Sequence, residues 1–341
     1  MDNANDAANQ HYVSQVEQRL NALNPNAEPS NQRIYSFTLA DRETFTLTLD
    51  SVRGRLISKN LALRDLFSFE VIPESLLRLN FETQFQQYEA TLEANTIALL
   101  KKLDDGSRDL KKEILEIFVA KVMNFFRNPY SVPKVLNTIG PLLRYEPTDP
   151  ELLTQYKAVL KGRKPQQAYL CAQLGITQEQ YRMWLAALFL MFMRPPPMEV
   201  NFLEGTVKQL FENPSGFPMV CVYRYNGEHA ENGCLVCDRG FTNPTPEPHL
   251  SFNFNLTSRA FVTYMFGSVD HLNDCIGAPP AFLESFRREP KTVRVLHFTN
   301  DLDALARYNQ NVVYQCHHAA YSSSRIIPGV RVDTAKLPKK L

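Results

Sequence analysis

The feature that most constrains the fold is an uncharged apolar run of ten residues, Trp184 to Met193. The run is too short to cross a bilayer, whose hydrocarbon core requires about 20 apolar residues in a helix. A capping pair precedes it, Thr177 with Gln180 three residues later, and Arg194 and a triple proline follow it. The pattern therefore predicts a helix over residues 177–193 that is buried on every side, at the centre of a helical core.

The composition suits one large hydrophobic core or two smaller ones, because 44% of the 341 residues are hydrophobic. The 37 Lys and Arg residues balance 36 Asp and Glu, and a net charge of +1 gives no general reason to bind nucleic acid or a membrane surface. Six cysteines are too few for a disulfide scaffold, and no apolar segment opens the chain. We therefore expect a cytoplasmic protein with no membrane partner, and exclude a small secreted scaffold, a disordered chain and a polytopic membrane protein.

The hydrophobic pattern changes period along the first two thirds of the chain. Residues 1–12 are polar and are expected to be mobile unless something holds His11 and Tyr12. Residues 34–39 and 44–49 alternate strictly, which predicts a β-hairpin. From about residue 72 the period is helical, and we expect helices over residues 76–103, 110–126, 131–138, 150–161, 165–173 and 177–193.

After the triple proline the pattern favours strands separated by turn-rich segments, over residues 219–225, 233–237, 250–254 and 292–296. A last helix is expected over about residues 301–319. The predicted class is α+β, with an N-terminal β-hairpin, a central all-helical block and a C-terminal, mainly antiparallel sheet closed by the last helix. The corresponding divisions are 1–71, 72–197, 198–328 packing with the N-terminal hairpin, and a basic flexible tail over 329–341.

Short segments follow one another in a recognisable order, at residues 10–15, 33–37, 88–94, 125–129, 234–240, 307–313 and 320–322. Together they resemble a bacterial family called domain of unknown function 4238, in which a His-Tyr-Val-Pro-Gln segment precedes a strand pair. Ser14 stands in place of the proline of that segment, and Arg239-Gly240 replaces an Asn-Pro pair later in the chain. The resemblance implies a shared scaffold and no settled activity. Family members often lie in mobile or defence-associated loci, which implies a role in antiviral defence or as a toxin.

The matched segments gather five polar residues, His11, Glu93, Arg127, Asp238 and Asn309. An imidazole transfers protons at neutral pH, carboxylates can orient it or hold a divalent metal ion, a guanidinium binds an anion and an amide positions a group. Such a set suits a hydrolase acting on nucleic acid or a nucleotide, for example a nuclease. In this hypothesis His11, Asp238 and Glu93 are catalytic, Arg127 and Asn309 bind the substrate, and all five converge on one pocket between the helical block and the sheet.

The alternative is that the same five residues are structural. His11 and Asn309 would then be buried hydrogen-bonding residues, Arg127 would cap a helix end and Asp238 would cap a turn. The protein would be a non-catalytic module that binds a partner protein in a defence or toxin complex. A shared, accessible cavity would favour the enzyme, whereas dispersed or backbone-paired side chains would favour the module. The sequence leaves both alternatives, and the oligomeric state, open.

A zinc site and a DNA-binding motif are two further hypotheses. Cys234 and Cys237 have the spacing of a zinc knuckle, and residues 316–318 (Cys-His-His) could supply other ligands, but an apolar strand between the two cysteines favours buried thiols. Residues 168–177 resemble the start of a helix-turn-helix, although the helix that follows is too apolar to read bases. Any nucleic-acid backbone contact is expected at the basic patches, namely Arg287, Arg288, Lys291 and Arg294, and the tail residues Arg325, Arg331, Lys336, Lys339 and Lys340.

Overall fold

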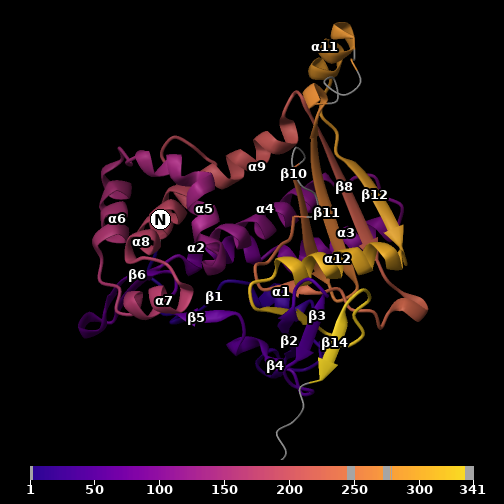
Figure 1. Ribbon diagram of the computed structural model, residues 1–341. Helices are drawn as coiled ribbons and strands as arrows, with labels where there is room; N and C mark the ends of the chain where they lie inside the picture. Colours follow the sequence, from indigo (N-terminus) through magenta and orange to yellow (C-terminus); the bar gives the residue numbers. More distant parts are fainter. Residues whose placement is uncertain (1–2, 244–249, 272–276, 278, 335–341) are drawn as a thin grey trace, which may run out of the picture.

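The computed structural model describes residues 3–243, 250–271, 277 and 279–334 of the chain. It contains 45% helix and 24% strand, and its N-terminal strands, central helices and C-terminal antiparallel sheet confirm the predicted α+β class. Figure 1 shows the helical block on one side of the molecule and the C-terminal sheet on the other, with the N-terminal strands at one end of that sheet.

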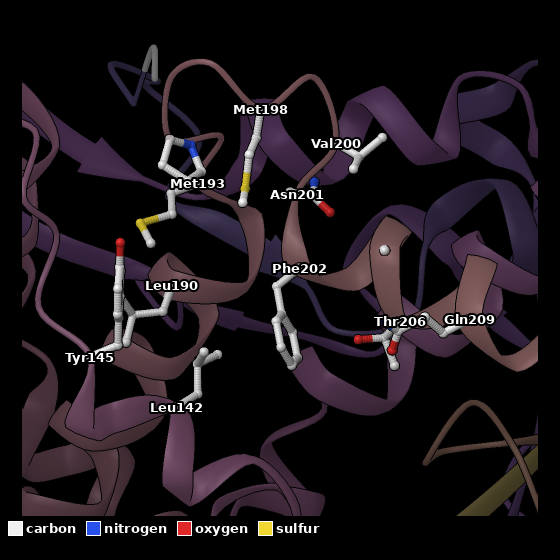
Figure 2. A pocket seen from close by; sticks show the side chains of 12 residues that line it. Leu142, Tyr145, Leu190, Met193, Met198, Val200, Asn201, Phe202, Thr206 and Gln209 are labelled. Atoms are coloured by element: carbon white, nitrogen blue, oxygen red, sulfur yellow. The ribbon is translucent and has the colours of Figure 1, made fainter.

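The helical block is built around the apolar run that opened the sequence analysis. Its helices are α2 (Glu82–Glu89), α3 (Leu92–Asp104), α4 (Lys111–Arg127), α5 (Val132–Ile139), α6 (Pro150–Lys161), α7 (Gln167–Leu174), α8 (Gln178–Phe192) and α9 (Phe202–Glu212). Helix α8 begins at the predicted capping box of Thr177 and Gln180, and every residue from Trp184 to Phe192 is buried. An apolar pocket opens between the end of α8 and the start of α9 (Figure 2). Within the described residues, no helix combines the length and apolar character needed to cross a membrane.

The C-terminal sheet has the strand order β10-β11-β8-β12. Its strands are β8 (Gly216–Arg224), β10 (Leu250–Thr257), β11 (Ala260–Ser268) and β12 (Arg294–Thr299). The first three neighbours pair antiparallel and β12 pairs parallel with β8, so the sheet is mainly antiparallel, as predicted. Helix α11 (Pro280–Arg288) lies at the far end of this sheet (Figure 1).

A second sheet joins the two ends of the chain, in the order β14-β3-β2-β13-β9. Its strands are β2 (Arg33–Asp41), β3 (Thr46–Leu49), β9 (Val236–Cys237), β13 (Ala319–Ser322) and β14 (Arg331–Thr334), and β4 (Arg55–Leu56) also pairs with β2. The predicted hairpin is confirmed as β2 and β3. The expected flexible tail is wrong for its first part, because Arg331–Thr334 pair with β3 along their whole length; residues 335–341 lie outside the described residues.

Helix α12 (Leu302–Gln315) packs between the two sheets and closes the fold (Figure 1). The ring of Tyr308 on α12 stacks on Phe261 of β11 at 4.1 Å between centroids, and Leu305 and Val313 share a buried cluster with Phe37 of β2. The helix ends at Gln315, earlier than the predicted residue 319, because the chain turns there to form β13.

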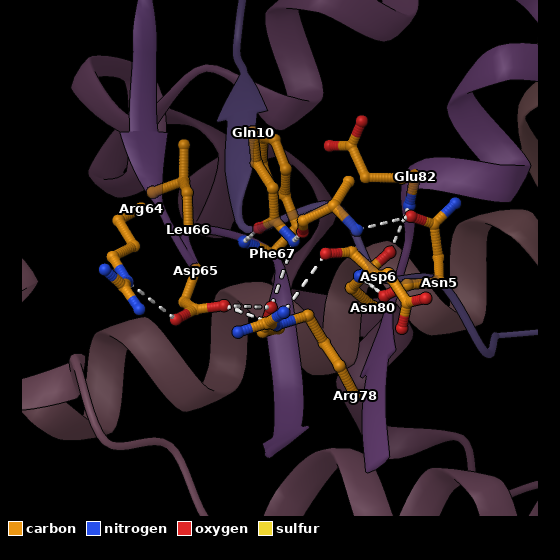
Figure 3. Close-up of polar contacts among 12 residues, drawn as sticks. Asn5, Asp6, Gln10, Arg64, Asp65, Leu66, Phe67, Arg78, Asn80 and Glu82 are labelled. Atoms are coloured by element: carbon orange, nitrogen blue, oxygen red, sulfur yellow. Dashed lines mark hydrogen bonds and ion pairs between the residues drawn. The ribbon is translucent and has the colours of Figure 1, made fainter. Parts of the chain in front are cut away.

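The N-terminal segment is held in place rather than mobile. Strand β1 (Asn9–His11) pairs with β5 (Ala62–Arg64), and β6 (Ser68–Ile72) pairs with β7 (Leu77–Asn80). Strand β7 replaces the start of the helix predicted over 76–103, because pairing with β6 overrides the local helical pattern. Figure 3 shows the polar contacts that hold the segment, among them Asn80 Nδ2 to the carbonyl of Asn5 (2.8 Å) and Arg78 Nη1 to that of Asp6 (3.1 Å). Helix α1 (Gln15–Arg19) follows directly.

Candidate functional site

His11 lies at the end of β1, where its imidazole is buried against the helical block. The Nδ1 atom lies 3.4 Å from the side-chain amide of Gln15, and Nε2 makes no hydrogen bond within the described part of the chain. Burial and the guanidinium groups of Arg127 and Arg19 lower the pKa of His11 to about 4, although backbone groups nearby offset part of that shift. The imidazole is therefore neutral at pH 7.

Arg127 is fully buried at the C-terminal end of α4, and its charge is already neutralised. One guanidinium nitrogen lies 2.6 Å from a carboxylate oxygen of Glu89, and two others donate to the side-chain carbonyl of Asn124 at 2.7 and 3.0 Å. The guanidinium carbon also lies 5.0 Å from the ring centroid of Phe85. A substrate anion would therefore have to compete with Glu89 for this cation.

The hydrogen bonds of Arg127 continue into a buried polar network that joins α1, α2 and α4. Asn124 donates to one carboxylate oxygen of Glu17 at 2.8 Å, and Lys121 lies 2.7 Å from the other. The side chains of Glu17 and Lys121 have no exposed surface, so this ion pair ties α1 to α4 inside the core. A buried pair of this kind contributes less to net stability than its separation suggests, yet removing one partner is costly.

Glu82 and Glu89 stand seven residues apart on one face of α2, and both lie near Arg127. Burial, reinforced by the charge of Glu89 and opposed by that of Arg127, raises the pKa of Glu82 to about 7. Sequence reasoning missed both residues. The signal that could have found them is two carboxylates on one face of a helix, two turns apart, facing a helix end that carries an arginine.

Glu93, the predicted second carboxylate, is exposed in the first turn of α3 and does not join the network. The continuous helix expected over residues 76–103 is interrupted between Glu89 and Leu92. Glu89 and Glu93 therefore belong to different helices, and it is Glu89 that meets Arg127. The prediction thus named a carboxylate four residues, or about one helical turn, after the one that pairs with Arg127.

Asp238 is buried just after β9, and its carboxylate binds backbone rather than a catalytic partner. It accepts the N–H groups of His317 at 2.8 Å, His318 at 2.7 Å and Ala319 at 3.0 Å. The backbone carbonyl of Asp238 accepts the side-chain amide of Asn128 at 2.8 Å. The carboxylate thus holds the turn between α12 and β13, and only its backbone contacts the end of α4.

Asn309 on α12 is also used entirely for backbone hydrogen bonds. Its side-chain oxygen accepts the N–H of Leu235 at 3.0 Å, and its amide donates to the carbonyls of Gly233 at 3.0 Å and Pro328 at 3.2 Å. The residue ties the last helix to the segment before β9 and lies apart from His11 and Arg127. Of the five predicted residues, His11 and Arg127 are the two that lie near each other. The backbone carbonyl of Asp238 contacts Asn128, the residue after Arg127.

The apolar pocket between α8 and α9 contains none of the five predicted residues (Figure 2). It has a volume of about 420 Å³ and no charged residue lines it; Leu142, Leu190 and Met193 lie on one side and Thr206 and Gln209 on the other. Part of its apolar lining faces solvent, since 64% of Met198 and 50% of Val200 are exposed. A pocket of this character suits apolar groups.

The remaining sequence hypotheses have structural outcomes. Cys234 and Cys237 are buried free thiols, and no three His, Cys, Asp or Glu side chains among the described residues are arranged to hold a metal ion. His317 and His318 lie beyond the end of α12, where their rings contact each other at 3.9 Å. In the helix-turn-helix hypothesis, the helix that would read bases is α8, and its residues from Trp184 to Phe192 are buried in the core.

In the basic patch near residue 290, two of the four predicted residues, Arg287 and Arg288, have acidic partners. Arg287 pairs with Asp270 at 2.6 Å and Arg288 with Glu284 at 3.4 Å, and the ammonium of Lys291 lies 3.7 Å from the ring centroid of Phe286. Of the second patch, Lys336, Lys339 and Lys340 lie outside the described residues.

No protein-family model, curated protein or solved structure matches this chain. The resemblance to the family called domain of unknown function 4238 therefore stays a prediction.

Proposed function

We propose that this protein acts by binding, as a non-catalytic module of a protein complex, and that its buried polar residues are structural. The observation that carries this proposal is the use of Asp238 and Asn309, whose side-chain polar groups bind six backbone groups between them. Glu93 is exposed and apart, and Arg127 is neutralised by Glu89. A hydrolase would need several of these groups free and facing one cavity.

The surface that we assign to the partner protein is the pocket between α8 and α9. Its lining is uncharged, and Met198, Val200 and Phe202 expose apolar area that would be buried by apolar side chains of a partner. Membership of a defence or toxin complex in a bacterial cytoplasm is the setting implied by the family resemblance, and we retain it as part of the proposal.

A hydrolysis assay tests the non-catalytic assignment. Purified wild-type protein and the variant His11→Gln are incubated with single-stranded DNA, RNA and nucleoside triphosphates in the presence of Mg²⁺, after circular dichroism has shown that both are folded. We expect no turnover that depends on His11. A hydrolytic activity present in the wild type, lost in folded His11→Gln and kept in the surface variant Glu93→Gln would contradict the proposal.

The second candidate is the hydrolase, and His11 is the observation that favours it. The imidazole is neutral at pH 7, its Nε2 makes no hydrogen bond among the residues that the structure describes, and Arg127 lies nearby. A neutral imidazole beside a cation is a plausible arrangement for a general base that acts on an anionic substrate. The same assay distinguishes the candidates, because this one requires that His11→Gln be inactive although folded.

A further inference from the structure

A polar cleft lies where five segments of the chain meet, and it shares no residue with the buried polar network. It is formed by the turn after α1, by β2, by the residues after the turn Gly227–His229, by the β10–β11 turn and by the loop after β13. Its volume is about 420 Å³, within the range of small-ligand sites.

Two arginines with no carboxylate partner line this cleft. Arg259 comes from the β10–β11 turn and Arg325 from the loop after β13, and both are exposed. Within the described residues neither guanidinium takes part in a hydrogen bond or ion pair, in contrast to Arg287 and Arg288. Glu231 is the only acidic residue of the lining, so two positive charges face one negative charge. The cleft therefore favours an anion that carries more than one charge.

The wall that carries Arg325 is restrained by hydrogen bonds and close packing within the chain. The hydroxyl of Ser324 donates to the carbonyl of Glu231 at 2.6 Å and accepts the N–H of Ile326 at 3.0 Å. Gly233 packs so closely beneath this loop that a Cβ there would meet the hydroxyl of Ser322 at 2.5 Å. The guanidinium of Arg325 lies 5.8 Å from the ring centroid of Tyr35, which restrains the side chain. Such preorganisation lowers the entropic cost of binding.

We propose that this cleft binds the phosphate group of a small phosphate monoester. A phosphate dianion matches two guanidinium groups in charge and in hydrogen-bond geometry, and the hydroxyls of Ser258 and Ser323 add donors in the same cleft. Leu23 and Pro25 form an apolar edge that suits the organic part of such a molecule. The site goes beyond the proposed partner-binding role and uses none of the residues of the buried network or the apolar pocket.

Titration calorimetry at low ionic strength tests the proposal on the full chain, with inorganic phosphate, adenosine monophosphate and adenosine as probes. We expect both phosphate-bearing probes to bind and adenosine not to bind. Arg259→Gln and Arg325→Gln should each weaken binding about tenfold or more, because each removes a charged donor. Glu231→Gln should tighten binding, because it removes the one opposing charge. The matched control is Arg53→Gln, an exposed arginine outside the cleft whose loss should leave the affinity unchanged.

Three outcomes would overturn the site: no heat with either phosphate-bearing probe, equal binding of adenosine and adenosine monophosphate, or wild-type affinity in both arginine variants. An equal loss of affinity in Arg53→Gln would show that binding depends only on the overall charge of the protein, and it would also contradict the proposed site. Because all the variants lie on the surface, circular dichroism should show unchanged folding. None of these results depends on whether His11 supports hydrolysis, so failure of this site and failure of the non-catalytic proposal can be told apart.

Discussion

At the scale of single residues, the fold shifts the pKa values of His11 and Glu82 into a range where their effect on stability can be measured. Both lie near Arg127, and burial is the main cause of each shift, but it acts in opposite directions because it disfavours the charged form of each group. The pKa of His11 falls to about 4, and that of Glu82 rises to about 7. The two residues should therefore affect the pH dependence of stability with opposite signs.

For His11, the unfolded chain binds more protons than the folded one between pH 4 and 6.5, so the free energy of unfolding falls as the pH is lowered through this range. Replacing His11 with Gln should remove up to about 3 kcal/mol of this pH dependence. Urea unfolding of wild type and His11→Gln at several pH values between 4.5 and 7.5 measures the difference. Parallel curves for the two proteins would show that His11 is not the titrating group.

For Glu82, the folded chain binds more protons than the unfolded one between pH 4.5 and 7, so the free energy of unfolding falls as the pH rises through this range. Glu82→Gln removes the ionisable group and should be more stable than wild type at pH 8, by up to about 3 kcal/mol, with the difference vanishing near pH 4.5. Thermal unfolding at the two pH values checks this. A variant less stable than wild type at pH 8 would contradict it.

At the scale of secondary-structure elements, the turn between α12 and β13 depends on one carboxylate. Asp238 accepts three consecutive backbone N–H groups there, and β13 is the strand through which the hairpin β2–β3 joins β9. Buried N–H groups without an acceptor are costly. The side chain that the sequence suggested as catalytic thus positions β13, the strand between β2 and the edge strand β9.

Asp238→Asn should lower the free energy of unfolding by about 1–3 kcal/mol, because an amide has one acceptor oxygen in place of two and leaves a partly buried N–H group without this acceptor. The matched control is Glu93→Gln, which changes a carboxylate to an amide on the exposed face of α3 and should stay within about 0.5 kcal/mol of wild type. Chemical denaturation of the three proteins at pH 7 makes the comparison. Equal free energies of unfolding for all three proteins would contradict the structural role of Asp238.

At the scale of the whole molecule, the two ends of the chain fold as one unit. Strands β2 and β3 lie between β13 and β14, and the main hydrophobic cluster contains residues of the N-terminal segment, of α8 and of β8 and β11. The tertiary contacts that carry stability therefore cross every division suggested by the sequence pattern, and we expect no part to unfold much earlier than the rest.

This expectation can be measured with two probes in distant places. Trp184, the single tryptophan, lies in the helical core and donates to the carbonyl of Phe126 at 2.7 Å. Its fluorescence should change at the same denaturant concentration as the loss of amide protection in β13. Transitions that separate would show that the helical block and the second sheet unfold independently.

Sequence by itself determined the elements that depend on local signals. The capping box at Thr177, the proline that begins α6 and the alternation of β2 and β3 are short-range features, and the structure places these elements where they were predicted. The α+β class follows from the order of such elements. The candidate site came from the family resemblance and not from any local signal, and of its five residues His11 and Arg127 lie close enough for the charge of Arg127 to lower the pKa of His11.

Only the tertiary structure decided which distant groups meet. Strands β7 and β14 exist because of the strands they pair with, and a two-residue interruption between α2 and α3 separates Glu89, the partner of Arg127, from Glu93. The cleft with Arg259 and Arg325 is assembled from five separate segments, none of which carries a motif. Such contacts depend on strand pairing and helix packing between residues up to about 300 positions apart, so no local periodicity encodes them.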